Sequence, residues 1–69
     1  MKIYQVEQDF GDYTTLVTTD INDVLNNVNT LTDRSYINIW ESGELIKTFG
    51  YKDKEPSYDN VYIELMSGV

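Results

Sequence analysis

The stretch that decides the fold is residues 35–51, which read SYINIWESGELIKTFGY. β-Branched and aromatic residues fill it on both sides of Ser42-Gly43, and residues of these kinds favour strands. A serine–glycine pair between two such runs is typical of a two-residue hairpin turn, because glycine tolerates the positive φ that the turn requires. We therefore predict a β-hairpin with strands 35–41 and 44–51.

A two-residue loop also predicts the register of this hairpin, because residues at equal distances from the turn lie opposite one another. The expected pairs are Ile39–Ile46, Ile37–Thr48, Trp40–Leu45, Asn38–Lys47 and Tyr36–Phe49. One face of the hairpin is then mainly aliphatic and the other mainly aromatic.

The N-terminal part of the chain repeats the hairpin pattern. Residues 2–7 and 13–19 are rich in strand-forming types, and Asp9-Phe10-Gly11-Asp12 separates them. Gly11 provides the positive φ of a tight connection, so a second hairpin is predicted here. Its register stays open, because Leu16 and Val17 are adjacent and cannot share a face.

One helix is predicted, from Asp20 to Leu31. Asp20 suits the N-cap position, and Asp23 adds negative charge near the helix N-terminus. The helix has apolar residues at the spacing of one buried face, namely Ile21, Val24, Leu25, Val28 and Leu31. Its remaining positions are mostly asparagine, a poor helix former, so docking must stabilise it.

After a polar connection, residues 52–59, the alternating residues 60–66 predict a final strand. The fold class is therefore α+β, with an antiparallel sheet of about five strands and a single helix packed on one face. The order is hairpin, helix, hairpin, final strand. A chain of 69 residues makes one domain, 1–69.

The two faces of the C-terminal strands are expected to differ in chemistry. The aliphatic face has Ile37, Ile39, Ile46, Val61, Ile63 and Leu65. The aromatic face has Tyr36, Trp40, Phe49, Tyr51 and Tyr62, together with Leu45 and Met66. One helix covers one face, so the aromatic face is either a binding surface or, if the sheet curls, a second small core.

Acidic residues dominate the charge of the protein. Twelve acids and five bases give a net charge of −7, and six of the acids lie between Lys2 and Arg34 with no base among them. Such a charge repels nucleic acid and membrane surfaces and attracts basic protein surfaces. An acidic surface that serves only solubility is the alternative.

The composition argues against catalysis and against metal or cofactor binding. The chain has no cysteine and no histidine, which removes thiolate and imidazole chemistry. Asp9-Phe10-Gly11 matches a protein-kinase magnesium motif in letters only, because the other kinase motifs are absent from so short a chain. The N-terminus does not resemble a signal peptide, and no run approaches the roughly 20 apolar residues of a membrane span. We expect a cytoplasmic protein that is not an enzyme.

The chain resembles the small acidic inhibitor proteins of phages and mobile elements, of which anti-CRISPR proteins are the best known. The resemblance rests on the acidic stretch 7–33, on the hairpin–helix–hairpin order, and on a composition rich in Asn, Ile, Tyr and Lys. It implies a partner with a basic groove for DNA or guide RNA, and a host-cell cytoplasmic location.

Candidate partner-binding residues follow from this resemblance and from the predicted faces. The electrostatic contacts are Glu7, Asp9, Asp12, Asp20, Asp23, Glu41 and Glu44, and the anchors are Tyr36, Trp40, Phe49 and Tyr62. No direct nucleic-acid binding is expected. Two other interpretations stay open: a structural or regulatory homodimer formed through the aromatic face, and an inhibitor of host RNA polymerase.

Overall fold

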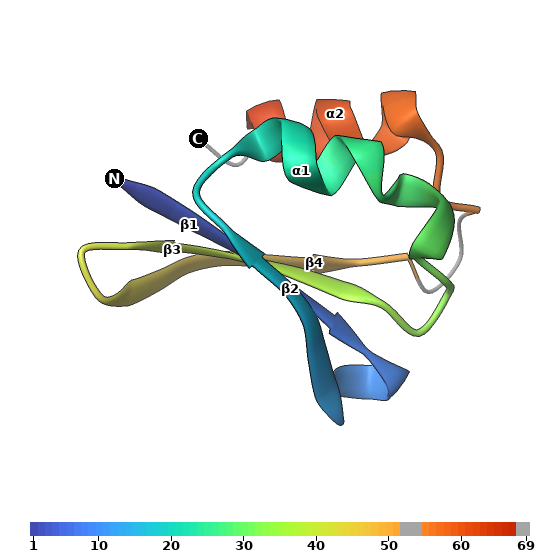
Figure 1. Cartoon of the computed structure of the whole chain (residues 1–69), viewed down its shortest axis with the longest axis horizontal. Coiled ribbons are helices and arrows are strands. Elements are labelled where there is room, and N and C mark those ends of the chain that lie inside the picture. The colour runs from blue at the N-terminus through green and yellow to red at the C-terminus, as the bar shows by residue number, and fades with distance from the viewer. Residues whose placement is uncertain (52–54, 68–69) are drawn as a thin grey trace.

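The structure is a computed structural model that describes residues 1–51 and 55–67. Four antiparallel strands form one sheet in the order β2-β1-β3-β4. Both α-helices lie on the same face of this sheet (Figure 1). The elements are β1 (Lys2–Gln8), the 3-10 turn η1 (Asp9–Gly11), β2 (Tyr13–Thr18), α1 (Ile21–Asn26), the 3-10 turn η2 (Val28–Thr30), β3 (Tyr36–Glu41), β4 (Glu44–Gly50) and α2 (Tyr58–Ser67).

The predicted α+β class and the antiparallel sheet are confirmed, but the predicted final strand 60–66 is wrong. These residues belong to the helix α2, so the sheet has four strands and two helices cover it. Ser57 begins this helix, since its side-chain Oγ accepts from the backbone N–H of Asn60 at 3.3 Å and its carbonyl from that of Val61 at 2.9 Å. This capping pattern decides against a strand.

The predicted helix 20–31 is confirmed in its first half only. Asp20 is the N-cap, and its Oδ1 accepts from the backbone N–H of Asn22 at 2.9 Å. The α-helical conformation ends at Asn26, because Asn27 adopts φ −109° and ψ 17° and its side-chain amide donates to the Asp23 carbonyl at 2.7 Å. The chain then continues as the 3-10 turn η2, in keeping with the poor helix propensity of asparagine.

A β-bulge settles the register of the first hairpin. Val6 pairs with Leu16 and Glu7 pairs with Thr14, so that Thr15 is an extra residue in β2. Leu16 consequently lies on the helix side of the sheet with Val6, whereas Val17 lies on the opposite face and is exposed.

A second irregularity corrects the predicted register of the β3–β4 hairpin. The turn at Ser42-Gly43 is confirmed: both residues have positive φ, at 53° and 80°, as a type I′ turn requires. The pair Trp40–Leu45 is also confirmed. Beyond it, Ile46 is an extra residue and every later pair shifts by one. The observed pairs are Ile39–Lys47, Asn38–Thr48, Ile37–Phe49 and Tyr36–Gly50.

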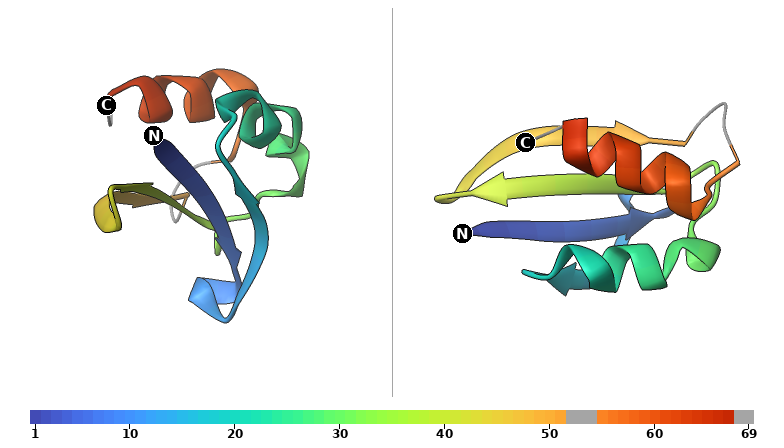
Figure 2. Two further views of the ribbon diagram at one scale, coloured as in Figure 1. Left: turned by 60° about the vertical axis from the view of Figure 1, so that its left-hand side comes forward. Right: turned by 90° about the horizontal axis from the view of Figure 1, so that it is seen from above.

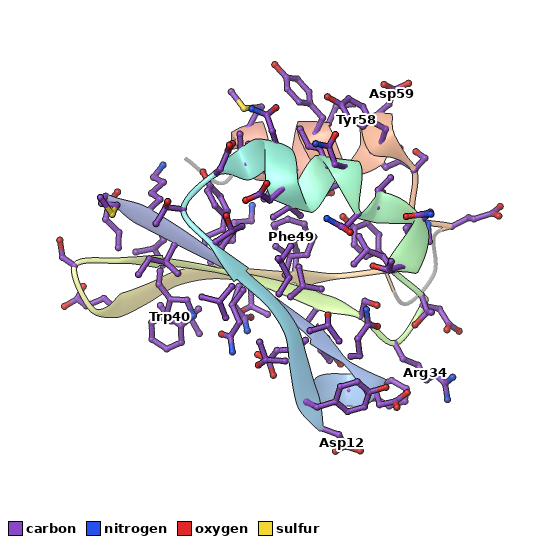
Figure 3. All side chains as sticks on the ribbon, viewed as in Figure 1. Asp12, Arg34, Trp40, Phe49, Tyr58 and Asp59 are labelled. Atoms are coloured by element: carbon purple, nitrogen blue, oxygen red, sulfur yellow. The ribbon has the colours of Figure 1, made fainter. Side chains whose placement is uncertain are left out.

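The predicted division into an aliphatic and an aromatic face is wrong. The register shift changes the face on which the residues of β4 lie, and the residues of α2 are not part of the sheet. Phe49 lies on the helix side of the sheet and Trp40 on the opposite side (Figure 3). Phe49 contacts Tyr51 edge-on, with ring centroids 6.2 Å apart, and Tyr51 is fully buried in the core. Tyr62 and Met66 are on the exposed side of α2. The shift leaves Ile46 exposed, because it is the bulged residue.

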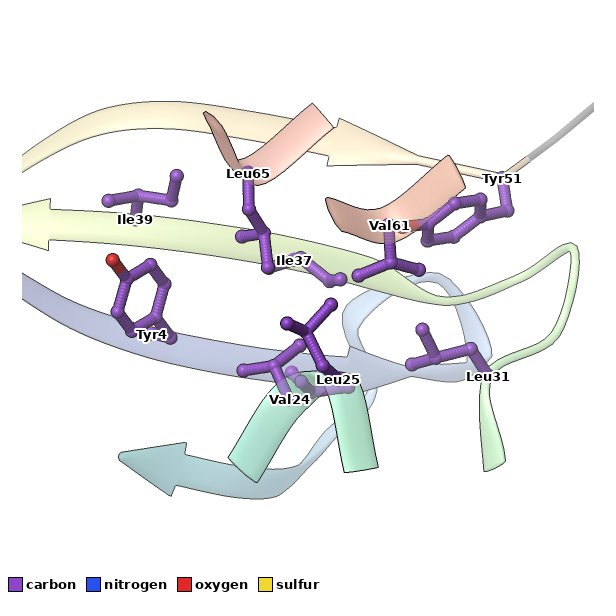
Figure 4. Close-up of a cluster of buried hydrophobic side chains, with 10 residues drawn as sticks. Tyr4, Val24, Leu25, Leu31, Ile37, Ile39, Tyr51, Val61 and Leu65 are labelled. Atoms are coloured by element: carbon purple, nitrogen blue, oxygen red, sulfur yellow. The ribbon is translucent and has the colours of Figure 1, made fainter. Parts of the chain in front are cut away.

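The core lies between the sheet and the two helices, which run side by side above it (Figure 2). Val24 and Leu25 of α1 and Val61 and Leu65 of α2 descend onto the central strands (Figure 4). The buried apolar residues are Tyr4, Val6, Val24, Leu25, Leu31, Ile37, Ile39, Tyr51, Val61 and Leu65. Since one face of the sheet holds all of this core, the other face is free for polar side chains.

Candidate functional site

A groove of about 580 Å³ lies between β2 and the segment formed by α1 and η2. β2 comes close to the start of α1 at its Thr18 end and diverges from the helix toward Tyr13 (Figure 1). The groove is lined by Val6, Gln8, Asp9, Tyr13, Thr15, Leu16, Val24, Asn27, Thr30, Leu31, Thr32 and Arg34. Its volume is in the range of pockets that bind ligands or partner side chains.

The β-bulge in β2 shapes the floor of this groove. Regular alternation would turn Thr15 and Leu16 to opposite faces of the sheet, yet both line the groove. Leu16 forms an apolar floor with the buried side chains of Val6, Val24 and Leu31. The groove therefore offers an apolar floor with polar groups around it.

A buried polar network fixes the inner wall of the groove. Gln8 and Ser35 are both buried, and the Ser35 hydroxyl donates to Gln8 Oε1. Gln8 Nε2 donates to the Thr30 carbonyl at 3.2 Å, and Ser35 Oγ accepts from the backbone N–H of Thr32 at 2.8 Å. These bonds join β1 to the segment that follows α1, so they fix the position of one wall of the groove.

Three charged or titratable side chains stand at the rim. Arg34 Nε lies 3.8 Å from Asp9 Oδ1, with both side chains about half exposed. The Tyr13 hydroxyl donates to Asp9, and this hydrogen bond together with the negative charge of Asp9 raises the pKa of Tyr13. Tyr13 thus presents a protonated hydroxyl at the rim, with its hydrogen bond directed to Asp9.

The backbone beside the rim is strained and displays an aromatic ring. Asp9, Phe10 and Gly11 all have positive φ, at 50°, 60° and 92°. That conformation is unfavourable for phenylalanine, yet the Phe10 side chain is 63% exposed and gains little from burial. The backbone N–H of Phe10 donates to the Arg34 carbonyl at 3.0 Å, which fixes the backbone of this turn against the segment after η2. Such strain without a packing benefit is typical of functional positions.

The sheet face opposite the helices carries a row of hydrogen-bonded polar side chains that crosses all four strands. Gln5 Nε2 donates to Thr14 Oγ1 at 2.9 Å, Asn38 Nδ2 donates to Gln5 Oε1 at 3.2 Å, and Thr48 Oγ1 donates to Asn38 Oδ1 at 2.8 Å. Asn38 also donates to the carboxylate of Glu7. We call Thr14, Gln5, Asn38 and Thr48 the polar row.

An apolar patch lies beside the polar row, toward the Ser42-Gly43 turn. It consists of Ile3, Val17, Trp40 and Leu45, and it borders a shallow depression of about 300 Å³. The Trp40 indole N–H donates to Gln5 Oε1 at 2.9 Å, so the ring has a fixed orientation. This patch replaces the larger aromatic face predicted from the sequence.

The structure brings some of the predicted binding residues together and separates others. Glu7, Asp9 and Asp12 gather at the β1–β2 end, where Asp12 and Arg34 are seen in Figure 3. Glu41 and Glu44 pair at the opposite end of the sheet.

The remaining predicted residues are dispersed, and several have structural contacts. Asp20 caps α1, and Asp23 accepts from the Thr18 hydroxyl at 2.5 Å. The Tyr36 ring lies against Gly50, where a Cβ atom would come within 3.0 Å of it. Phe49 is partly buried against the core. Tyr62, on the exposed side of α2, is remote from Trp40 on the other face of the sheet.

The sequence interpretation missed Phe10, Tyr13 and Arg34. The signal for Phe10 was present, because a phenylalanine inside a turn beside glycine has no periodic partner with which to be buried. Tyr13 and Arg34 gave no such signal, since they meet only through the fold. Across residues 1–51 and 55–67, no group of three or more acidic, cysteine or histidine side chains could hold a metal ion. No helix in that part of the chain is long and apolar enough to cross a membrane.

Comparisons with protein-family models, with curated proteins and with solved structures find no match to this chain.

Proposed function

We propose that the protein is a non-catalytic inhibitor that occupies a basic nucleic-acid-binding groove of a host defence enzyme of the CRISPR effector type. The observation that carries this proposal is the β1–β2 end of the molecule, where Asp9 and Asp12 flank the exposed ring of Phe10. The proposal places the protein in the cytoplasm of the host cell, where such an enzyme acts.

The charge at this end supports a basic partner. The hydrogen bond from Phe10 to the Arg34 carbonyl brings the segment that contains Asp33 next to the tip, so Asp33 adds to Asp9 and Asp12. Arg34 offsets part of this negative charge through its pair with Asp9. A surface that binds nucleic acid presents lysine and arginine to phosphate, and carboxylates on a rigid tip meet the same groups.

Phe10 supplies what charge alone does not. Electrostatic attraction accelerates encounter, whereas buried aromatic anchors slow dissociation. Phe10 stands at the end of a tip that the Arg34 hydrogen bond and the β1–β2 ladder hold in one conformation. A preorganised anchor loses little entropy on binding, which favours affinity.

The experiment measures association of the purified protein with a panel of guide-loaded CRISPR effector nucleases, together with their cleavage of target DNA. Binding to at least one effector should be fast at low salt, and target DNA should compete with it. Asp12→Asn should lower the association rate, and Phe10→Asn should raise the dissociation rate by about tenfold or more, as for a binding hot spot. Asparagine tolerates positive φ, so Phe10→Asn should leave the fold intact.

Asp59→Asn is the matched control, because Asp59 is an exposed carboxylate on α2, away from the β1–β2 end, and is not among the predicted contacts. It should leave both rates close to those of the wild type. Binding that is indifferent to Asp12→Asn, to Phe10→Asn and to competing DNA would contradict the proposed function. If Trp40→Ala weakens binding instead, the contact with the partner lies at the apolar patch.

A further inference from the structure

We infer that the outer edge of β2 and the groove beside it form a docking site for an extended peptide segment that has a neutral centre and a basic residue at each end. This segment would add to the sheet as a fifth strand. That a basic partner protein supplies the segment rests on the proposed function, whereas the site itself does not.

β2 is an edge strand whose outer side pairs with no other strand among the described residues. The strand order places β2 at one end of the sheet, and no described backbone hydrogen bond outside the sheet involves Tyr13–Thr18. The strand reads YTTLVT, with no charged residue and no proline to discourage pairing. Each edge strand has one bulged residue, Thr15 in β2 and Ile46 in β4, but β4 also carries the charged residues Glu44 and Lys47. β2 is therefore the edge that favours strand addition.

The groove gives such a strand a place for its side chains. Thr15 and Leu16 line the groove, which thus runs along the helix side of β2. In an added strand, every second side chain points to that side of the sheet. Those side chains would enter the groove above Leu16 and Val24, whose side chains are apolar. Backbone bonds to β2 would then provide affinity, and the groove would select small or medium apolar residues.

Charge decides between a peptide and a second copy of this chain. Asp12 precedes β2, Asp20 follows it, and both are exposed. In an antiparallel pair of two β2 strands, Asp12 of each copy would lie close to Asp20 of the other, and facing like charges destabilise a sheet. A segment with lysine or arginine at its two ends would instead place a cation near each carboxylate. The edge is thus complementary to a basic-ended strand.

The test titrates the ¹⁵N-labelled protein with the synthetic peptide acetyl-RTVTVTR-amide, which has valine at alternate positions and arginine at both ends. Amide signals of residues 13–18 should shift, and their outward-facing N–H groups should become protected from hydrogen exchange. Residues 44–50 on the other edge should not change. The same peptide with alternate backbone amides methylated on the β2-facing side should not bind, because it keeps the charge and loses the hydrogen bonds.

Two further comparisons isolate the charge. The peptide with glutamate at both ends should bind at least tenfold more weakly. Asp12→Asn with Asp20→Asn should weaken binding of the basic peptide about three- to tenfold, since two exposed ion pairs are lost. Asparagine is as good an N-cap as aspartate, so α1 persists. The double variant Glu44→Gln with Asp59→Asn removes two charges elsewhere and should have little effect.

Three results would overturn the inference: no shift in β2, equal binding of the methylated peptide, or a dimer of the protein alone that protects the β2 amides. If the peptide binds β2 while no effector nuclease binds the protein, the docking site stands and the proposed function fails. If an effector binds through Asp12 and Phe10 without protecting the β2 amides and the peptide does not bind, the proposed function stands and the strand-addition site fails.

Discussion

The side chain of Ser35 joins parts of the chain that are distant in sequence. It is 1% exposed, donates to Gln8 of β1 and accepts from the backbone of Thr32 in the segment after η2. A buried polar group that loses its partner keeps its desolvation cost without compensation. The Ser35 hydroxyl therefore contributes two of the hydrogen bonds that stabilise the groove wall.

Replacing Ser35 by alanine should lower the free energy of unfolding by about 1–3 kcal/mol, because Gln8 Oε1 and the Thr32 N–H both lose their partner. Ser67→Ala is the matched control, since Ser67 is exposed and its hydroxyl donates to the Ile63 carbonyl at 2.8 Å. It should change the same quantity by less than about 0.5 kcal/mol. Urea denaturation of both variants measures this, and equal losses would contradict the structural role of Ser35.

The buried hydroxyl of Tyr51 should make the free energy of unfolding decrease at alkaline pH. Burial raises the pKa of its hydroxyl, the negative charge of Glu64 raises it further, and the hydroxyl has no hydrogen-bond partner among the described residues. The unfolded chain releases this proton near pH 10, and the folded chain releases it only at higher pH. Above pH 10 the unfolded state thus binds fewer protons, so stability decreases as pH rises.

The expected decrease is about 1 kcal/mol between pH 10 and pH 11. Tyr51→Phe should remove this component while keeping most of the core contacts. Tyr58→Phe, a half-exposed tyrosine on α2, should retain the wild-type dependence. Urea midpoints recorded from pH 8 to pH 11 provide the comparison. Parallel pH profiles for the wild type and Tyr51→Phe would exclude Tyr51 as the source.

Residue-scale prediction from the sequence succeeded where the chemistry is local. The N-cap role of Asp20 and the turn at Ser42-Gly43 follow from residue type and neighbours alone, and both are confirmed. The burial of Tyr51 and the rim contact between Asp9 and Arg34 depend on elements that meet in space. The periodicity of apolar residues along the chain does not predict which elements come into contact.

At the scale of elements, α2 is where two periodicities compete. Val61, Ile63 and Leu65 alternate as in a strand, while Val61 and Leu65 also have the i, i+4 spacing of a helix. The Ser57 cap resolves the competition, and Ile63 is consequently 62% exposed while Leu65 is fully buried.

The difference in exposure between Ile63 and Leu65 gives a direct test of the helical conformation of α2. Leu65→Ala should destabilise the protein by about 2–4 kcal/mol, because it leaves a cavity between α2 and the sheet. Ile63→Ala removes a similar side chain from the surface and should cost less than about 0.5 kcal/mol. Thermal or urea unfolding of the two variants distinguishes the two conformations. Comparable losses would favour a strand in which Ile63 and Leu65 share a buried face.

The two β-bulges explain why the strand positions could be predicted from the sequence while the faces could not. The extra residues Thr15 and Ile46 each shift the alternation by one beyond the bulge. A one-residue slip moves every later side chain to the other face. The single shift at Ile46 therefore turned Phe49 toward the core, against which it packs, and removed it from the predicted aromatic surface.

On the scale of the whole molecule, charge opposes folding. The net charge of −7 on 69 residues concentrates negative potential on a small surface. The Asp9–Arg34 pair is exposed, and exposed pairs contribute little stability. We therefore expect repulsion among the acids to outweigh local attraction, and dissolved salt to relieve it.

Raising sodium chloride from about 20 mM to 300 mM should increase the midpoint of thermal unfolding by a few degrees, because the Debye length falls below about 10 Å. Potassium chloride at equal ionic strength should give the same increase, because screening depends on ionic strength and not on the identity of the cation. A midpoint that falls with added salt would show that ion pairs, and not repulsion, dominate the electrostatic free energy.

The position of β1 at the centre of the sheet has a consequence for the order of events in folding. Each hairpin closes locally, but β1 and β3 meet only after a loop of roughly 28 residues, from Gln8 to Tyr36, has closed. Non-local pairing of this kind limits folding rates, so the β1–β3 seam should form in the transition state. In stopped-flow refolding, Asn38→Ala at the seam should slow folding, whereas Leu65→Ala in the last helix should mainly accelerate unfolding. Thus β1, the first strand of the chain, would enter the native sheet only when β3 pairs with it.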